Sequence, residues 1–423
     1  MPRSVTLLVL AGGNVLAGLV AQLLIYGLIG PGATTDAFFA AVTVPQMLAG
    51  MVTVSLSSVL LPLFAGDTPE QQNASAWALI ALLGAISTLV AASLSALAPW
   101  WIELVFPGFD TETRALCVEL ARIQAFSLIF LALAVVAHAA AYARDRFARV
   151  EAITLLNTAL SAGLLALTLP RHGIVAAAWI ELGRSALQLL WFLPLLGWPV
   201  RHAAGWQSLP LIWRRTRPML LGNLYSRTDP LVDRFLLSMG SAGDLSLYGL
   251  AQQIYSAVAN VFGRAFGTPA ITALSIAAKQ GDADAFRRTY RRALAYLLGL
   301  PLALYLPLLL FGEPVMQVAL GVGRMDPAHV HTLWTLMVLL GGVLLLGASG
   351  ALVAGLFYSI GDTRTPTYLG MLTFTVFIVA RYFAFTAHGA AGVAVAASIY
   401  HAFNLCLLFM IFPRRLRAAR VFT

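Results

Sequence analysis

Charged residues are scarce in this sequence. Asp, Glu, Lys and Arg together make up 11% of the 423 residues, hydrophobic residues make up 60%, and the mean hydropathy is +0.83. A soluble domain carries about 25% charged residues, so this chain has too few charges to cover a water-exposed surface. The shortage excludes a soluble globular protein and predicts an integral membrane protein.

Cysteine and the short motifs of common enzymes are also nearly absent. The two cysteines, Cys117 and Cys406, are far apart and lie in apolar stretches, which excludes a disulfide framework and a cysteine-based metal site. The sequence contains no Walker phosphate loop, no G-x-S-x-G elbow and no H-E-x-x-H pair. We therefore expect no enzymatic activity, no metal and no cofactor, while a coupling ion, H⁺ or Na⁺, stays open.

Apolar stretches of membrane-spanning length are what the sequence has in abundance. About 20 apolar residues in a helix cross the hydrocarbon core of a bilayer, which is ~30 Å thick. Backbone polar groups in lipid must be paired within the segment, so the stretches are expected to be helices. The first stretch lacks a small-residue cleavage site, so we interpret it as a membrane helix and not as a signal peptide. The fold class predicted is all-α, with about twelve spans at residues 4–29, 36–65, 75–98, 117–142, 150–168, 173–197, 217–240, 244–276, 288–312, 328–357, 366–386 and 389–412.

Lys and Arg are distributed unevenly between the two sides of these spans. With the N-terminus in the cytoplasm, eighteen fall on the cytoplasmic side and three, Arg114, Arg171 and Arg324, on the outer side. Positive residues collect on the cytoplasmic side of membrane proteins. We therefore expect a multi-pass protein of the bacterial inner membrane with both termini cytoplasmic. Anionic membrane lipid then accounts for the net charge of +9, and a nucleic-acid partner has no support.

The six spans before the loop at 198–216 resemble the six spans after it. The matched features are Asp36 with Asp244, Pro62 with Pro269, and the loop Tyr142–Arg146 with Tyr358–Arg364. An even number of spans gives both halves the same orientation, which is typical of alternating-access transporters with a binding site between two lobes. We expect an N-lobe at 1–200, a cytoplasmic linker at 201–216 and a C-lobe at 217–423. Asp36 and Asp244 follow small-residue loops and are interpreted as helix N-caps.

The span at 217–240 concentrates charge inside the membrane. Arg227, Asp229, Asp233 and Arg234 lie within eight residues, and Asn223 precedes them by one turn. Each charge costs roughly 2.5–3.5 kcal/mol at mid-membrane, so we expect these side chains to face a protein interior or a wet cavity. Pro230 is expected to weaken or kink the helix. Interhelical ion pairs with a purely structural role are the alternative.

Polar side chains within three other spans are assigned to the same substrate cavity. They are Asn14, Gln22, Glu181, Arg184, Gln252, Gln253 and Arg264. Arginine offers planar donors to phosphate and amides suit hydroxyls, so the cavity suits an anionic head group that bears sugar. Glu181 and Arg184 are three residues apart and can instead pair within their own helix. Arg122 and Arg381 are expected to reach an interface or to pair locally.

Six segments resemble the MurJ/MviN lipid II flippase family. They follow the family's order: Gly30–Phe39, Val44–Leu48, Leu61–Pro62, Phe106–Phe109, Gly263–Ser275 and Gly355–Pro366. The resemblance implies the fold of the multidrug/oligosaccharidyl-lipid/polysaccharide exporter superfamily, with two six-helix lobes around a central cavity. It also implies a monomeric flippase that moves an undecaprenyl-linked sugar precursor, lipid II or a related lipid-linked glycan, by alternating access.

The sequence departs from this family in its charged positions. Family members usually have fourteen spans, of which twelve are expected here, and carry arginines in the first two. The matching charged positions hold uncharged residues here: Val15, Ala21, Gln22, Ala49, Gly50 and Gln253. Buried charge lies instead at 227–234 and Arg264, which suggests a relocated site for another glycan, or a member that no longer transports lipid II.

Two further functions stay open beside the flippase. One is a cation-coupled exporter of small molecules from the same superfamily, with Asp229 or Asp233 binding the ion. The other is a non-transporting scaffold of cell-envelope assembly, which the missing N-lobe charges would fit.

Overall fold

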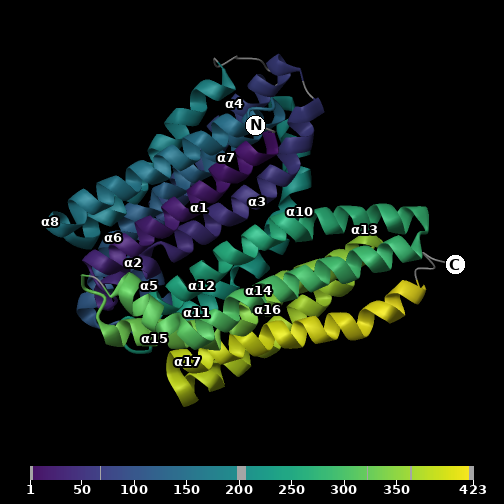
Figure 1. Cartoon of the computed structure of the whole chain (residues 1–423). Helices are drawn as coiled ribbons and strands as arrows, with labels where there is room; N and C mark the ends of the chain where they lie inside the picture. Colours follow the sequence, from purple (N-terminus) through teal and green to yellow (C-terminus); the bar gives the residue numbers. More distant parts are fainter. Residues whose placement is uncertain (1–2, 67, 198–205, 322, 363, 419–423) are drawn as a thin grey trace. The chain divides into compact units, whose positions relative to one another are not determined.

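The chain is helical throughout the part that the structure describes. A computed structural model describes residues 3–66, 68–197, 206–321, 323–362 and 364–418, and no strand occurs among them (Figure 1). The helices are α1 (Arg3–Leu28), α2 (Ala33–Ala41), α3 (Thr43–Gly66), α4 (Pro69–Ala96), α5 (Ala98–Val105), α6 (Thr111–Ala125), α7 (Ser127–Ala143), α8 (Phe147–Leu196), α10 (Leu209–Arg227), α11 (Asp229–Leu237), α12 (Asp244–Phe262), η1 (Gly263–Gly267), α13 (Thr268–Gln280), α14 (Ala283–Leu320), α15 (Pro327–Leu339), α16 (Gly341–Ser359) and α17 (Arg364–Ala418). The prediction of an all-α membrane protein is confirmed.

Each of the twelve predicted spans lies in helix. Within the described ranges, nine helical segments are long and apolar enough to cross a membrane. Two of these, α8 and α17, each contain two predicted spans that join at a kink without a loop. The span at 217–240 is not among the nine, because it is divided into α10 and α11 and rich in charge. The short helix α5 was not predicted.

The chain divides into two compact units, Met1–Leu245 and Ser246–Thr423. The core of the first unit lies between α3, α4, α7 and α8, where Leu60, Val136 and Phe192 are fully or almost fully buried. In the second unit, α13, α14, α16 and α17 enclose a separate core around Leu274 and Leu297. Helices α10 and α11 belong to the first unit. The predicted ends of the N-lobe at 200 and of the linker at 216 stay predictions.

The internal repeat is visible in matching local geometry at a constant spacing of 216 residues (326 minus 110, 389 minus 173). Asp110 caps α6 by accepting a hydrogen bond from the Thr113 N–H, and Asp326 caps α15 in the same way at His329, both at 2.9 Å. Further along, Gly173 in α8 has φ 64° and ψ −158°, and Gly389 in α17 has φ 58° and ψ −139°. Positive φ is a conformation that glycine adopts without a steric penalty, so the same device ends the fifth and the eleventh span.

The turn that precedes each kinked helix repeats as well. In the first unit the N–H groups of Asp145 and Arg146 donate to the carbonyls of Tyr142 and Ala141, at 3.1 and 3.0 Å. The corresponding N–H groups of Gly361 and Asp362 donate to Tyr358 and Phe357, at 3.0 and 2.9 Å. Both turns close with a positive φ, at Asp145 and at Gly361. The loop match that predicted the repeat therefore reflects one shared backbone turn.

Neither Asp36 nor Asp244 occupies the N-cap position that the sequence predicted for it. Helix α2 begins at Ala33 with Gly32 as its cap, so Asp36 lies inside the first turn, 3% exposed. Its Oδ2 atom accepts a hydrogen bond of 2.6 Å from the N–H of Gly243. Asp244 is itself the first residue of α12, and its carboxylate reaches back to the N–H of Ser241 at 2.8 Å. The N-cap prediction is wrong for Asp36, because a distant backbone donor binds its carboxylate.

Candidate functional site

The charged segment of the seventh span is interrupted where its proline lies. Helix α10 ends at Arg227 and α11 begins at Asp229, with Pro230 in its first turn. Proline lacks an N–H and clashes with the preceding turn, so it is tolerated at a helix start and not in a helix interior. The predicted break is confirmed. It gives α11 its own termini, with Asp229 at the positive N-terminal end and Arg234 at the negative C-terminal end, where each charge is stabilised.

Arg234 ties α11 to the junction between α2 and α3. Its Nη1 atom donates to the carbonyl of Phe39 at 2.9 Å and also to the Thr43 hydroxyl. The Thr43 hydroxyl in turn donates to the same Phe39 carbonyl at 2.8 Å. Carbonyls in the last turn of a helix lack intrahelical partners, and Arg234 supplies one where the second span is divided. The neighbouring Asp233 is 1% exposed, and Arg234 is partly buried.

Two of the motif segments meet around α11. Asp36, from the segment Gly30–Phe39, binds the N–H of Gly243 beyond the end of α11. The turn Phe106–Phe109 packs on the same end: a Cβ atom on Gly108 would lie 2.3 Å from the Ser238 carbonyl oxygen. That approach is too close for any residue except glycine. The motifs therefore form one packed, polar region of the first unit.

Three of the amide side chains predicted for the cavity lie in the first unit. Two of them bond a neighbouring helix, and the oxygen of the third has no donor among the described residues. Asn223 donates to the Ser55 hydroxyl at 2.8 Å, which joins α10 to α3. Asn14 accepts from the Thr158 hydroxyl at 2.8 Å, which joins α1 to α8. Gln22 is 7% exposed, and its Oε1 atom accepts no hydrogen bond from any described residue. A buried acceptor of this kind costs free energy unless a partner arrives, so Gln22 has capacity for a hydroxyl or amide donor.

Glu181 and Arg184 pair within α8. Arg184 Nε donates to Glu181 Oε2 at 2.9 Å, and its Nη2 donates to the other carboxylate oxygen. The Arg184 carbonyl also accepts from the Asn157 side chain at 2.9 Å. Glu181 and Arg184 therefore neutralise each other within α8 through two hydrogen bonds. This corresponds to the alternative in which the two residues pair within their own helix.

The remaining predicted site residues lie on α10, α12 and η1. Gln252 donates to the Tyr248 hydroxyl one turn earlier at 3.3 Å, and Gln253 is exposed. Arg264 lies in η1, a π-helical segment, and such segments are frequent at functional sites. The side chains of Arg227 and Arg264 lie outside the described part of the structure.

One buried charge was missed as a candidate. Arg381 in α17 is 1% exposed, with its guanidinium carbon 5.5 Å from the centre of the Tyr400 ring. Of the two alternatives expected for Arg381, the contact with Tyr400 fits local pairing. A charge inside a membrane helix is by default a functional candidate, and that rule would have singled it out. Arg122, by contrast, is exposed.

These surroundings suit binding of a polar group within a membrane protein. Buried arginines and amides supply donors for phosphate and for hydroxyls. No group of three or more His, Cys, Asp or Glu side chains that could hold a metal occurs in the described residues. These arginine and amide side chains are therefore suited to recognise and move a polar ligand.

Comparison with known proteins agrees with this assessment. The family model described as lipid II flippase MurJ matches residues 25–422. A probable lipid II flippase MurJ of Vibrio cholerae is 26% identical over 416 residues, 93% of this chain and 79% of the relative. A lipid II flippase MurJ of Burkholderia cenocepacia is 24% identical over 417 residues, 93% of this chain and 80% of the relative.

Solved structures show the same fold. A lipid II flippase MurJ in an inward closed conformation superposes with a TM-score of 0.80 at 17% identity, covering 97% of this chain and 87% of that one. An inward-facing multidrug transporter of the MATE family and MOP superfamily gives 0.77 at 16% identity, covering 96% and 95%. The family match spans both units, and this multi-pass membrane protein belongs to the lipid II flippase MurJ family, a family of transporters and not of enzymes.

Proposed function

We propose that this protein translocates an undecaprenyl-linked sugar precursor, lipid II or a related lipid-linked glycan, across the bacterial inner membrane by alternating access. The family match over residues 25–422 carries the proposal. The repeat of helix caps, turns and kinks at a constant spacing supports it, because paired repeats are the usual basis of alternating access.

Five of the predicted site residues are proposed to receive the head group. Arg227, Arg234 and Arg264 are assigned to the pyrophosphate, and Gln22 and Gln252 to sugar hydroxyls. Arg234 uses one terminal nitrogen, Nη1, for both of its hydrogen bonds to the protein. Its Nε and Nη2 atoms bond no other described residue, so they can donate to an oxyanion while Nη1 holds the α2–α3 junction.

The orientation of the protein in the membrane is inferred from the distribution of Lys and Arg. We propose that both termini are cytoplasmic, that anionic lipid contacts the basic cytoplasmic loops, and that the protein works as a monomer without a cofactor. Cysteine accessibility tests the orientation: a cysteine replacing Arg149, which is exposed, should react with a membrane-impermeant thiol reagent only in inverted vesicles.

Complementation tests the function directly. The chain is expressed in bacteria depleted of their own lipid II flippase, membrane insertion is verified by immunoblot, and growth and lipid II at the outer face are scored. Rescue supports lipid II as the substrate. Failure with normal insertion excludes lipid II, and the assay then moves to other undecaprenyl-linked glycans.

Variants test the assigned site. Joint replacement of Arg227, Arg234 and Arg264 by alanine should abolish translocation without abolishing insertion. Arg122→Ala, which removes an exposed charge, is the matched control and should have no effect. Translocation at the wild-type rate in the triple variant would remove these residues from the site.

A cation-coupled exporter is the second candidate, and the burial of Asp233 favours it. A carboxylate that is 1% exposed within a membrane protein is a plausible ligand of H⁺ or Na⁺. Under this alternative, Asp233→Asn abolishes efflux of cationic drugs and drug resistance while leaving lipid II at the outer face unchanged.

A further inference from the structure

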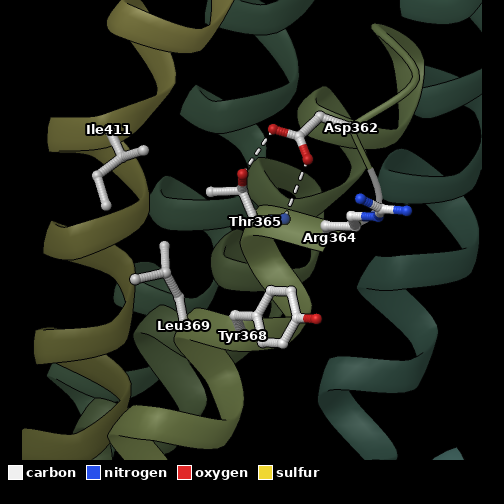
Figure 2. Close-up of a pocket in the computed structure, with 6 residues that line it drawn as sticks. All are labelled: Asp362, Arg364, Thr365, Tyr368, Leu369 and Ile411. Atoms are coloured by element: carbon white, nitrogen blue, oxygen red, sulfur yellow. Dashed lines mark hydrogen bonds between the residues drawn. The ribbon is translucent and has the colours of Figure 1, made fainter.

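A cavity lies at the start of α17 in the second unit, beside the repeated turn. It has a volume of about 470 Å³ and is lined by Asp362, Arg364, Thr365, Tyr368, Leu369 and Ile411. Figure 2 shows Leu369 directed toward the helix segment that carries Ile411, while Arg364 and Tyr368 extend to the opposite side. The cavity therefore has an apolar side and a side with a guanidinium and a phenol.

The corresponding place in the first unit is filled by the protein itself. By the 216-residue spacing, Ile411 corresponds to Leu195, and Ile360 and Asp362 correspond to Arg144 and Arg146. Arg144 Nη1 donates to the carbonyls of Leu195 and Leu196, both at 3.0 Å. Arg146 adds a bond of 3.2 Å to Leu195. Two arginines thus close the gap between the turn and the end of α8.

Among the described residues of the second unit, no side chain makes the corresponding bonds. Ile360 cannot donate a side-chain hydrogen bond, and Asp362 faces the start of its own helix. The Asp362 carboxylate accepts from the Thr365 N–H at 3.0 Å and from the Thr365 hydroxyl at 2.6 Å (Figure 2). Because this carboxylate caps α17, its charge is balanced by the helix N-terminus. It therefore does not exclude an anion from the cavity.

Arg364 and Tyr368 are available to a ligand. Both side chains are exposed, and neither is hydrogen-bonded or ion-paired with another described residue. A guanidinium binds phosphate oxygens with two parallel hydrogen bonds, and the phenol adds a donor. Arg414 lies exposed one turn beyond Ile411. Clustered arginines beside a membrane span attract anionic lipid head groups.

An apolar track leads away from this polar end. Tyr368, Leu372, Val376, Val379 and Phe383 are between 53% and 67% exposed, and their spacing of three to four residues places them on one face of α17. An acyl chain lying on this face would bring its head group to Arg364. Phosphate donors at one end and an exposed apolar track behind them match the two parts of a phospholipid.

We propose that this cavity is a binding site for an anionic diacyl phospholipid, with the phosphate on Arg364 and Tyr368, one acyl chain against Leu369 and Ile411, and the other along the exposed face of α17 that begins at Tyr368. The bound lipid takes the place that Arg144 occupies in the first unit. The proposal concerns lipid binding alone and does not depend on which substrate is translocated.

Native mass spectrometry of the purified full chain tests this site, with phosphatidylglycerol and phosphatidylcholine added as probes. Loss of a hydrogen bond to a charged group corresponds to about a tenfold loss of affinity, so Arg364→Gln should reduce phosphatidylglycerol retention by about that factor. Phosphatidylcholine carries the same phosphate without a net negative charge, so it should be retained more weakly by the unmodified protein and change less in the variant. Leu369→Trp, which fills the cavity and keeps all charges, should reduce retention of phosphatidylglycerol as well. The matched control is Arg149→Gln, which removes an exposed arginine beside the corresponding turn of the first unit and should have no effect.

Three outcomes overturn the proposal. They are unchanged phosphatidylglycerol retention in both Arg364→Gln and Leu369→Trp, an equal loss in Arg149→Gln, and selective loss of added undecaprenyl pyrophosphate with phosphatidylglycerol retained. The last outcome assigns the cavity to a polyprenyl ligand. Elution volume and unfolding temperature of each variant without added lipid distinguish a lost site from a misfolded protein.

Discussion

The carboxylate of Asp36 accepts a 2.6 Å hydrogen bond from the N–H of Gly243, 207 positions later in the chain. The bond joins the start of α2 to the segment that follows α11, and both residues are buried. If the carboxylate is removed, the buried N–H of Gly243 has no acceptor in its place. Leaving a buried donor unpaired costs more free energy than the hydrogen bond itself contributes.

Asp36→Ala should therefore destabilise the first unit by about 1–3 kcal/mol, measured as a lower unfolding temperature of the purified protein. Asp36→Asn keeps an acceptor oxygen and should recover most of the loss. Equal destabilisation by the two variants would show that the negative charge, and not the hydrogen bond, is what stabilises this junction.

Arg234 is expected to tolerate no replacement, lysine included. Its Nη1 atom reaches both the Phe39 carbonyl and the Thr43 hydroxyl, and a lysine has a different reach and no planar fork. Arg234→Lys and Arg234→Ala should each cost about 1.5–3 kcal/mol of stability and lower translocation in the complementation assay. A lysine variant with wild-type stability and transport would show that charge alone suffices at this position.

Gly108 should be intolerant of the smallest side chain. A Cβ atom there would lie 2.3 Å from the Ser238 carbonyl oxygen and 2.4 Å from the Met239 Cα atom, both of them backbone. Gly108→Ala should destabilise the protein by roughly 1–3 kcal/mol, as overpacking does.

Gly163→Ala is the control for this substitution. It lies within α8 with no neighbouring atom within 4 Å of the added Cβ, so the change should be neutral or slightly stabilising. An unaffected Gly108→Ala protein would mean that the turn Phe106–Phe109 does not pack on α11 as described.

Arg144 should contribute more to stability than its neighbours in the sequence. Besides the carbonyls of Leu195 and Leu196, its guanidinium donates to the side chains of Gln72 and Asn73 on α4. Arg144→Ala removes all of these and should cost about 2–4 kcal/mol, since buried acceptors lose their partner.

Arg149→Ala removes an exposed arginine five residues away and should change stability by no more than about 0.5 kcal/mol. Unfolding in denaturant compares the two variants. A similar effect for both would place the stabilisation in net charge and not in the hydrogen bonds.

Hydrophobicity was enough to find the helices but not the places where they are interrupted. All twelve apolar stretches are helical, because a long apolar run in lipid has no other way to pair its backbone. The break between α2 and α3 has a local signal in Pro45, which lies in the first turn of α3, but the donor that Arg234 supplies to Phe39 comes from a distant helix. The proline-induced break before α11 was predictable, because its cause is local.

The candidate site shows the same division between local and distant causes. Charge inside a span predicted that Asp233 and Arg234 are buried, but their partners depend on how helices pack. Asp36 was misinterpreted as a cap because its acceptor role requires Gly243, 207 residues away. For Arg381 the sequence left open whether it reaches an interface or pairs locally, because nothing in its own segment reveals that Tyr400 covers it.

The kinks at Gly173 and Gly389 have a practical consequence for mapping the protein. At each, two membrane helices succeed one another with no loop between them. Residues 170–172 and 386–388 beside the kinks are exposed, but they are helical, whereas proteases cut most readily in exposed loops. Epitope tags inserted there should disrupt folding, whereas a single cysteine in place of Arg171, which is exposed, is the better way to reach this side of the first unit.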